Sequence, residues 1–172
     1  MPTVRIVLLC MGAAVAYGIL QDQVTARISV EYFTIGHPPI VPTNSPTVLG
    51  FVWGILGTWW VGLFLGLLLA AAARIGTAPK RAPATLARPV MSILIISAFV
   101  AALSGSLGFI LAQRGSVELV SPLAESVPSQ RHVSFVTAAW VHSASYLSGG
   151  VLGAGLAVRV WLLRRRPGES AA

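Results

Sequence analysis

The sequence predicts an all-α membrane protein, a four-transmembrane-helix bundle with a short extracytoplasmic β segment. Of its 172 residues, 55% are hydrophobic and only 10% are charged, whereas a soluble domain carries roughly 25% charged residues. Four apolar segments approach or exceed the roughly 20 helical residues that cross a bilayer. These segments cover residues 3–20, 47–73, 89–113 and 133–162, and we treat them as one integral membrane domain.

The distribution of basic residues predicts the topology. Arginine and lysine crowd the loop 74–88 and the tail 163–172, while the connections 21–46 and 114–132 hold both signs of charge. By the positive-inside rule, the loop 74–88 and both termini are cytoplasmic, and the other two connections lie outside. We therefore expect a multi-pass protein of the bacterial cytoplasmic (inner) membrane. The net charge of +7 sits beside the spans, so it does not indicate nucleic-acid binding.

The first span leaves one alternative open. Its basic start, apolar run and Ala14-Val15-Ala16 triplet are compatible with a cleaved signal peptide. The apolar run continues to Leu20, which favours a retained span. Cys10 is the only cysteine, so no disulfide can form within the chain.

Small residues predict how the spans pack, because helices in lipid associate through close backbone approach. In the second span, Gly50, Gly54 and Gly57 share one face, and Gly62 and Gly66 share a rotated face. The later spans carry two further stripes, which are Ser97, Ala101, Ser104 and Gly108, and then Ala138, His142, Ser145, Gly149 and Gly153. We therefore expect a compact bundle with these stripes turned inward.

The segment after the first span reads as a β-strand. In "VTARISVEYF", residues 24–33, polar and apolar residues alternate with a period of two. A single strand must pair its edges, so we expect it to pair with the segment 114–132 or with another protein. The following "HPPIVPTNSP" predicts a stiff, extended connector over the bundle.

Charged and aromatic residues of the two outer connections form a candidate functional cluster: Arg27, Glu31, Tyr32, His37, Arg131 and His132. Pairing of the two segments would bring Arg131 and His132 to Glu31 or His37, as an interfacial cluster of salt bridges and hydrogen bonds. The ligand types of a zinc site are also present in His37, His132 and Glu31. Their spacing matches no metal motif, so a metal site is the lesser alternative.

His142 is the ionisable side chain expected at mid-depth in the membrane, surrounded by Ser145 and Tyr146. A buried ionisable group in a membrane is a functional candidate. In the structural interpretation, a neutral His142 hydrogen-bonds to a serine such as Ser104, or to a backbone carbonyl, and joins two helices. The alternatives are a haem or metal ligand and a proton relay. A haem held by two histidines would need a second copy of the chain, because no other histidine is expected at this depth.

Two stretches resemble a family of small bacterial four-span membrane proteins. The first is "DQVTARISVEYFT" and the second is "HSASYLSGG". The matching residues are Asp22, Gln23, Ser29, Glu31, Tyr32, Phe33, Thr34, His142, Ser145, Tyr146 and Gly149. The resemblance implies that both stretches serve one design, and it implies no activity, cofactor or partner.

These observations favour a non-catalytic accessory or scaffold protein that binds a protein partner, or a second copy, through its outer loop and small-residue faces. The first alternative is a haem- or metal-binding redox protein that uses His142 or the pair His37 and His132. The second is an enzyme acting on a lipid-linked substrate at the outer interface. We expect no catalytic residues and no cofactor, since the carboxylates Asp22, Glu31, Glu118 and Glu125 are all expected outside the membrane.

Overall fold

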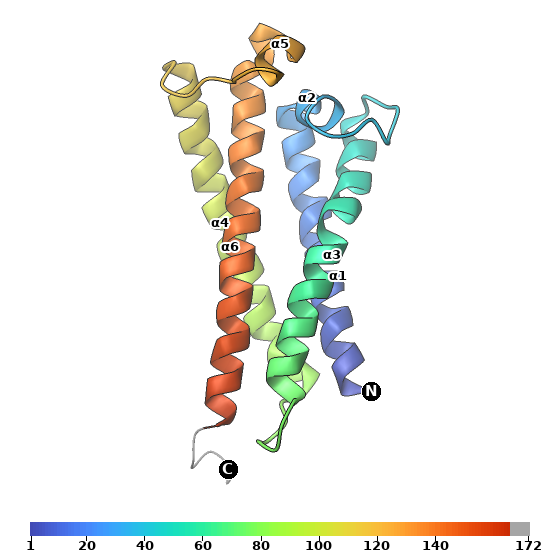
Figure 1. The fold of residues 1–172 in the computed structure, drawn as a ribbon. Helices are drawn as coiled ribbons and strands as arrows, with labels where there is room; N and C mark the ends of the chain where they lie inside the picture. Colours follow the sequence, from blue (N-terminus) through green and yellow to red (C-terminus); the bar gives the residue numbers. More distant parts are fainter. Residues whose placement is uncertain (166–172) are drawn as a thin grey trace.

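The protein is an all-helical bundle over residues 1–165, the part of the chain that the structure, a computed structural model, describes (Figure 1). Its four long helices are α1 (Pro2–Ile28), α3 (Pro46–Arg74), α4 (Pro83–Gln113) and α6 (His132–Arg164). All four are long and apolar enough to cross a membrane, which confirms the predicted multi-pass bundle. Of the expected tail 163–172, residues 166–172 lie outside the described part.

Short elements lie in the connections at one end of the bundle. They are α2 (Val30–Thr34), α5 (Leu123–Ser126) and the 3-10 turn η1 (Ser129–Arg131). Figure 1 places α2 and α5 together at this end, and the start of α1 and the finish of α6 at the other. We call these the α2 end and the Met1 end.

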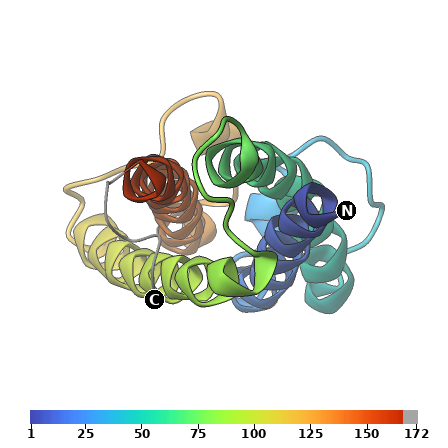
Figure 2. The same ribbon diagram turned by 90° about the horizontal axis from the view of Figure 1, so that it is seen from below.

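The long helices form two tightly packed pairs, α1 with α3 and α4 with α6. Contacts of α3 with α6 and of α1 with α4 join the pairs into one bundle, which Figure 2 shows along its axis. Glycines allow the first pair to pack closely: a Cβ added at Gly50, Gly54, Gly62 or Gly66 would lie 3.0 Å or less from an atom of α1. These four glycines therefore form one continuous contact with α1, whereas Gly57, the third member of the first expected face, faces Tyr146 of α6.

The predicted strand is wrong, because the segment is helical. Helix α1 continues to Ile28, and α2 follows after Ser29. The buried positions of the segment recur at helical spacing: Asp22, Thr25, Ala26, Ser29 and Phe33. Several of these buried residues are polar, so the alternation of polar and apolar residues does not follow burial. The first span is consequently longer than the expected 3–20, and the expected outer connection 21–46 starts later.

A buried arginine closes the Met1 end. Arg164, at the last turn of α6, is only 5% exposed. Its guanidinium donates to the carbonyl oxygens of Ala72 (2.6 Å), Ile75 (3.1 Å), Ala78 (2.8 Å) and Pro79 (2.7 Å). Carbonyls at a helix C-terminus lack partners within the helix, so this side chain caps α3 from α6. It is a structural residue as well as one of the basic residues of this end.

Candidate functional site

Ser29 sets the turn that folds α2 over the bundle. It is fully buried, and its extended backbone (φ −148°) ends α1. Its Oγ accepts a hydrogen bond from the Tyr32 backbone N–H at 3.3 Å and donates to Glu31 Oε2 at 3.0 Å. A serine in this position is a favoured helix N-cap. The sequence thus stops one helix and starts the next at a single residue.

An ion pair fastens α2 to the turn before α6. Arg131 Nε donates to Glu31 Oε1 at 2.8 Å, so the structure joins two residues of the expected outer cluster. Partial burial raises the pKa of Glu31, but hydrogen bonds from Arg131, its own backbone amide and Ser29, together with the Arg131 charge, outweigh burial. The net pKa of Glu31 lies below its ordinary value.

The other residues of the expected outer cluster do not join this ion pair, and two of them, Tyr32 and His37, contact each other. His37 Nδ1 lies 2.8 Å from the Tyr32 carbonyl oxygen, and His132 Nε2 lies 2.9 Å from the Val127 carbonyl oxygen. Arg27 donates to Thr47 Oγ1 at 3.0 Å and so ties α1 to α3. Among residues 1–165, no three His, Cys, Asp or Glu side chains lie close enough to hold a metal ion. The zinc arrangement proposed for His37, His132 and Glu31 is therefore not formed.

Aromatic rings cover the α2 end of the bundle. The Tyr32 ring stacks on His142 with centroids 4.6 Å apart, and His37 lies 4.5 Å from Trp53. Phe33 stacks on His37 at 5.7 Å, and Phe135 lies 5.5 Å from Tyr32. We call Tyr32, Phe33, His37, Trp53 and Phe135 the aromatic cap. It shields His142 from the solvent at this end.

His142 is 6% exposed and pairs with α1, not with α4. Its Nε2 lies 3.1 Å from Thr25 Oγ1 and 3.5 Å from Asp22 Oδ1. The expected partner, Ser104, instead donates to the Trp140 carbonyl oxygen at 3.2 Å. Asp22 is itself only 5% exposed and lies within α1, so the expectation that it belongs to the connection 21–46 is wrong. Because the expected first span ends at residue 20, it does not include Asp22 and Thr25, the two partners of His142.

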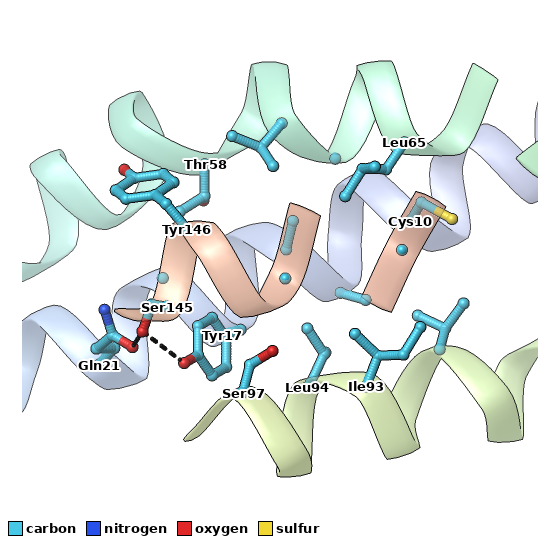
Figure 3. Close-up of a pocket in the computed structure, with 18 of the residues that line it drawn as sticks. Cys10, Tyr17, Gln21, Thr58, Leu65, Ile93, Leu94, Ser97, Ser145 and Tyr146 are labelled. Atoms are coloured by element: carbon cyan, nitrogen blue, oxygen red, sulfur yellow. Dashed lines mark hydrogen bonds between the residues drawn. The ribbon is translucent and has the colours of Figure 1, made fainter. Parts of the chain in front are cut away.

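A row of hydrogen bonds continues from this pair along α1 and α6. Tyr17 Oη lies 3.0 Å from Ser145 Oγ, and Ser145 donates to Gln21 Oε1 (Figure 3). The next residue of α6, Tyr146, donates to the Gly57 carbonyl oxygen at 3.0 Å and so reaches α3. The expected polar residues Ser145 and Tyr146 thus face two different helices. Tyr17 and Gln21 of α1 are the partners of Ser145.

A cavity of about 100 Å³ lies beside this row, between α1, α3, α4 and α6. Its wall is polar toward the α2 end and apolar toward the Met1 end, as Figure 3 shows for the labelled side chains. We call the first part the polar end; it comprises Tyr17, Gln21, Asp22, Thr58, Ser97, His142, Ser145 and Tyr146. The apolar end comprises Cys10, Leu65, Leu69, Val90, Leu94 and Leu156.

One wall residue has a polar atom without a partner. Ser97 is 1% exposed, and its Oγ makes no hydrogen bond within residues 1–165. An unsatisfied buried hydroxyl costs about 1–3 kcal/mol. Because Ser97 lines the cavity, a molecule in the cavity can supply the missing partner.

Known proteins give no guide to the role of this cavity. Comparison with protein-family models, with curated proteins and with solved structures found no match to the chain. The function is therefore inferred from the geometry of the site.

Proposed function

We propose that the protein binds an amphipathic, lipid-like small molecule in the cavity between its four spans. The observation that carries this proposal is the buried, unpartnered Ser97 Oγ in a wall that is polar at one end and apolar at the other. Ligand pockets combine a mostly apolar lining with a few polar groups that fix orientation. Here those polar groups gather at a single end, which suits a molecule with one polar head.

The length of the cavity suits a hydrocarbon tail. Cys10 and Gln21 of α1 both line it. They are separated by about 16 Å along the helix axis at roughly 1.5 Å per residue. That length is about half of the ~30 Å hydrocarbon core of a bilayer. A head at the polar end would thus place its tail parallel to the surrounding lipid chains.

We infer the orientation in the membrane from charge. The Met1 end carries the basic residues Arg5, Arg74, Lys80, Arg81, Arg88, Arg159 and Arg165, and the α2 end mixes both signs. By the positive-inside rule the Met1 end faces the cytoplasm and the α2 end faces outward. The aromatic cap then covers the polar end from the outer side. The resemblance to small bacterial membrane proteins favours a bacterial inner membrane.

The scaffold hypothesis has less support than the sequence suggested. It relied on an unpaired strand edge, and the segment is helical. It also relied on small-residue faces, and Gly50, Gly54 and Gly62 are used inside the chain against α1. A redox role for His142 would require its Nε2 to leave Thr25 and Asp22 before binding a metal. Binding of a ligand in the cavity requires no such rearrangement of His142, Thr25 and Asp22.

The proposal can be tested by photocrosslinking in phosphatidylcholine vesicles with a ten-carbon alcohol that carries a diazirine at the tail. We expect labelled peptides to include Ala14 and Leu94, which line the cavity, besides residues that face lipid. Gly149→Leu fills the cavity beside Ser97, and should remove the label from Ala14 and Leu94 while lipid-facing labels remain.

Gly150→Leu is the matched control, because a Cβ at Gly150 meets nothing within 4 Å and Gly150 does not line the cavity. The milder Gly149→Ala places its methyl 3.9 Å from Ser97 Oγ and keeps the test possible if the leucine variant does not fold. Equal labelling of the cavity residues in the Gly149 and Gly150 variants would disprove binding in the cavity.

A further inference from the structure

The hydrogen bonds of the cavity wall have fixed directions, and these directions describe the head group that would fit. Ser145 has one hydroxyl proton and donates it to Gln21 Oε1. Tyr17 must therefore be the donor in its 3.0 Å contact with Ser145 Oγ. Both hydroxyl protons at this place are used within the wall.

The same reasoning holds for the other donors at the polar end. Thr25, which contacts His142 but does not line the cavity, donates its hydroxyl proton to the Gln21 carbonyl oxygen at 3.1 Å; in that arrangement its Oγ1 accepts from the His142 tautomer protonated at Nε2. Tyr146 donates to the Gly57 carbonyl oxygen, and Thr58 donates to the Gly54 carbonyl oxygen. Of the hydroxyl groups that line the polar end, only that of Ser97 keeps an unused proton.

Acceptors, in contrast, remain unused. The Asp22 carboxylate receives no hydrogen bond from any residue in the described range 1–165, and its one polar contact there is His142 Nε2 at 3.5 Å. An ionised carboxylate can accept about four hydrogen bonds. Tyr17 Oη donates to Ser145 and still has accepting capacity. Apart from the Ser97 hydroxyl and the side-chain amide N–H groups of Gln21, the unused polar atoms at this end are therefore acceptors.

The negative charge of Asp22 also favours a head group that donates hydrogen bonds. Asp22 is the one acidic residue within the four long helices as the structure describes them. A carboxylate inside a membrane is costly unless a cation accompanies it. The nearest ionisable group is the imidazole of His142, which already donates to Thr25.

From these observations we propose that the molecule bound in the cavity is an amphipathic amine, whose ammonium group donates hydrogen bonds to the Asp22 carboxylate. Tyr17 Oη and Ser97 Oγ are further acceptors on the same wall. This inference rests on the proposed function, because it names the head group of the molecule that the cavity binds. A head group that only accepts hydrogen bonds, such as a ketone or an ester, would leave the Asp22 carboxylate without a donor.

A competition experiment separates the two proposals. Decylamine, 1-decanol and decanoate share one chain length and differ in head group, and each is titrated against the photoreactive alcohol in phosphatidylcholine vesicles. The readout is the loss of label from Ala14 and Leu94. We expect decylamine to compete at a concentration about tenfold or more below that of 1-decanol, the value of one charge-assisted hydrogen bond. Decanoate should be the weakest competitor.

Asp22→Asn should remove the preference for the amine and leave competition by 1-decanol. Glu118→Gln is the matched control: it removes the same charge from an exposed loop residue and should keep the preference, which corrects for attraction of cations to the membrane. Equal competition by amine and alcohol in the unmodified protein would overturn the ammonium site and leave the cavity proposal intact. A preference that persists in Asp22→Asn would also overturn it. If no competitor displaces the label, both proposals fail.

Discussion

Asp22 Oδ1 and His142 Nε2 lie 3.5 Å apart, and they join the first long helix of the chain to the last. Both side chains are buried, at 5% and 6% exposure. The Tyr32 ring stacks on the imidazole and closes the pair off from the α2 end. This pair lies where the aromatic cap meets the polar end of the cavity, so it links the packing of the α2 end to the proposed ligand site.

The two side chains should be energetically coupled. We predict that a double-mutant cycle of Asp22→Asn and His142→Gln gives a coupling free energy of about 1–3 kcal/mol, because the groups are buried and share a network. The measurement is reversible unfolding in mixed detergent micelles. Additivity of the two single changes, within about 0.5 kcal/mol, would show that the pair does not interact.

Close packing of α1 on α3 predicts a strong effect at one glycine. A Cβ at Gly54 would lie 2.5 Å from Ile19 Cα and 2.6 Å from Ile19 N. Because backbone atoms cannot give way cheaply, Gly54→Ala should lower the free energy of unfolding by about 1–3 kcal/mol. Gly155→Ala is the control, since its Cβ meets nothing within 4 Å. Equal unfolding midpoints for both variants would contradict the described packing.

The cap of α3 by Arg164 predicts that arginine and lysine are not equivalent there. A lysine keeps the charge but lacks the planar fork of donors. Arg164→Lys should therefore cost about 2 kcal/mol of unfolding free energy, through carbonyls left without partners. Arg159 is exposed, and Arg159→Lys should leave the unfolding midpoint unchanged. A neutral Arg164→Lys variant would show that the carbonyls find other partners.

The ion pair of Glu31 with Arg131 predicts a dependence of stability on pH. The folded pKa of Glu31 lies below its ordinary value of 4.5. The pair therefore stabilises the fold fully above the unfolded pKa, and this contribution is lost as the pH falls through the folded pKa. The pair is partly exposed, so its contribution is at most about 1 kcal/mol.

Thermal unfolding between about pH 6 and about pH 3 tests this linkage. The unmodified protein should lose more stability over that range than Glu31→Gln, which has no carboxyl group to protonate. Glu118→Gln, in an exposed loop position, should follow the unmodified protein. Identical pH profiles for Glu31→Gln and the unmodified protein would rule out a contribution from this pair.

Ser97 should behave as a binding residue and not as a packing residue. In lipid-free detergent, Ser97→Ala removes an unsatisfied hydroxyl and should raise the free energy of unfolding by up to about 1 kcal/mol. Ser104→Ala loses the hydrogen bond to the Trp140 carbonyl and should lower stability by about 1 kcal/mol. A loss of stability in Ser97→Ala would mean that its hydroxyl has a structural partner.

The spans were predictable because composition and length determine them. The second and fourth expected spans, 47–73 and 133–162, differ from α3 and α6 by one or two residues at each end. The third expected span, 89–113, ends with α4, which begins earlier at Pro83 and continues through Pro89. Hydropathy requires no knowledge of tertiary contacts, which is why it performs well here.

The candidate site was only partly predictable, and the reason lies at the end of α1. Burial there involves polar residues such as Asp22, Thr25 and Ser29, which hydropathy assigns to a loop. Their helical spacing was present in the sequence, and it would have placed Asp22 on the face that meets α6. The sequence does single out His142, Ser145 and Tyr146, and all three line the cavity. The aromatic cap depends on the turn at Ser29, which no periodicity reveals.

The most direct test of the central claim is native mass spectrometry of the protein released from phosphatidylcholine nanodiscs, after purification from the membranes in which it was made. We predict that the unmodified protein and Gly150→Leu retain an additional small amphiphile, and that Gly149→Leu retains none. If the unmodified protein and Gly149→Leu instead each appear at the mass of the chain alone under the gentlest release, the cavity is not a binding site.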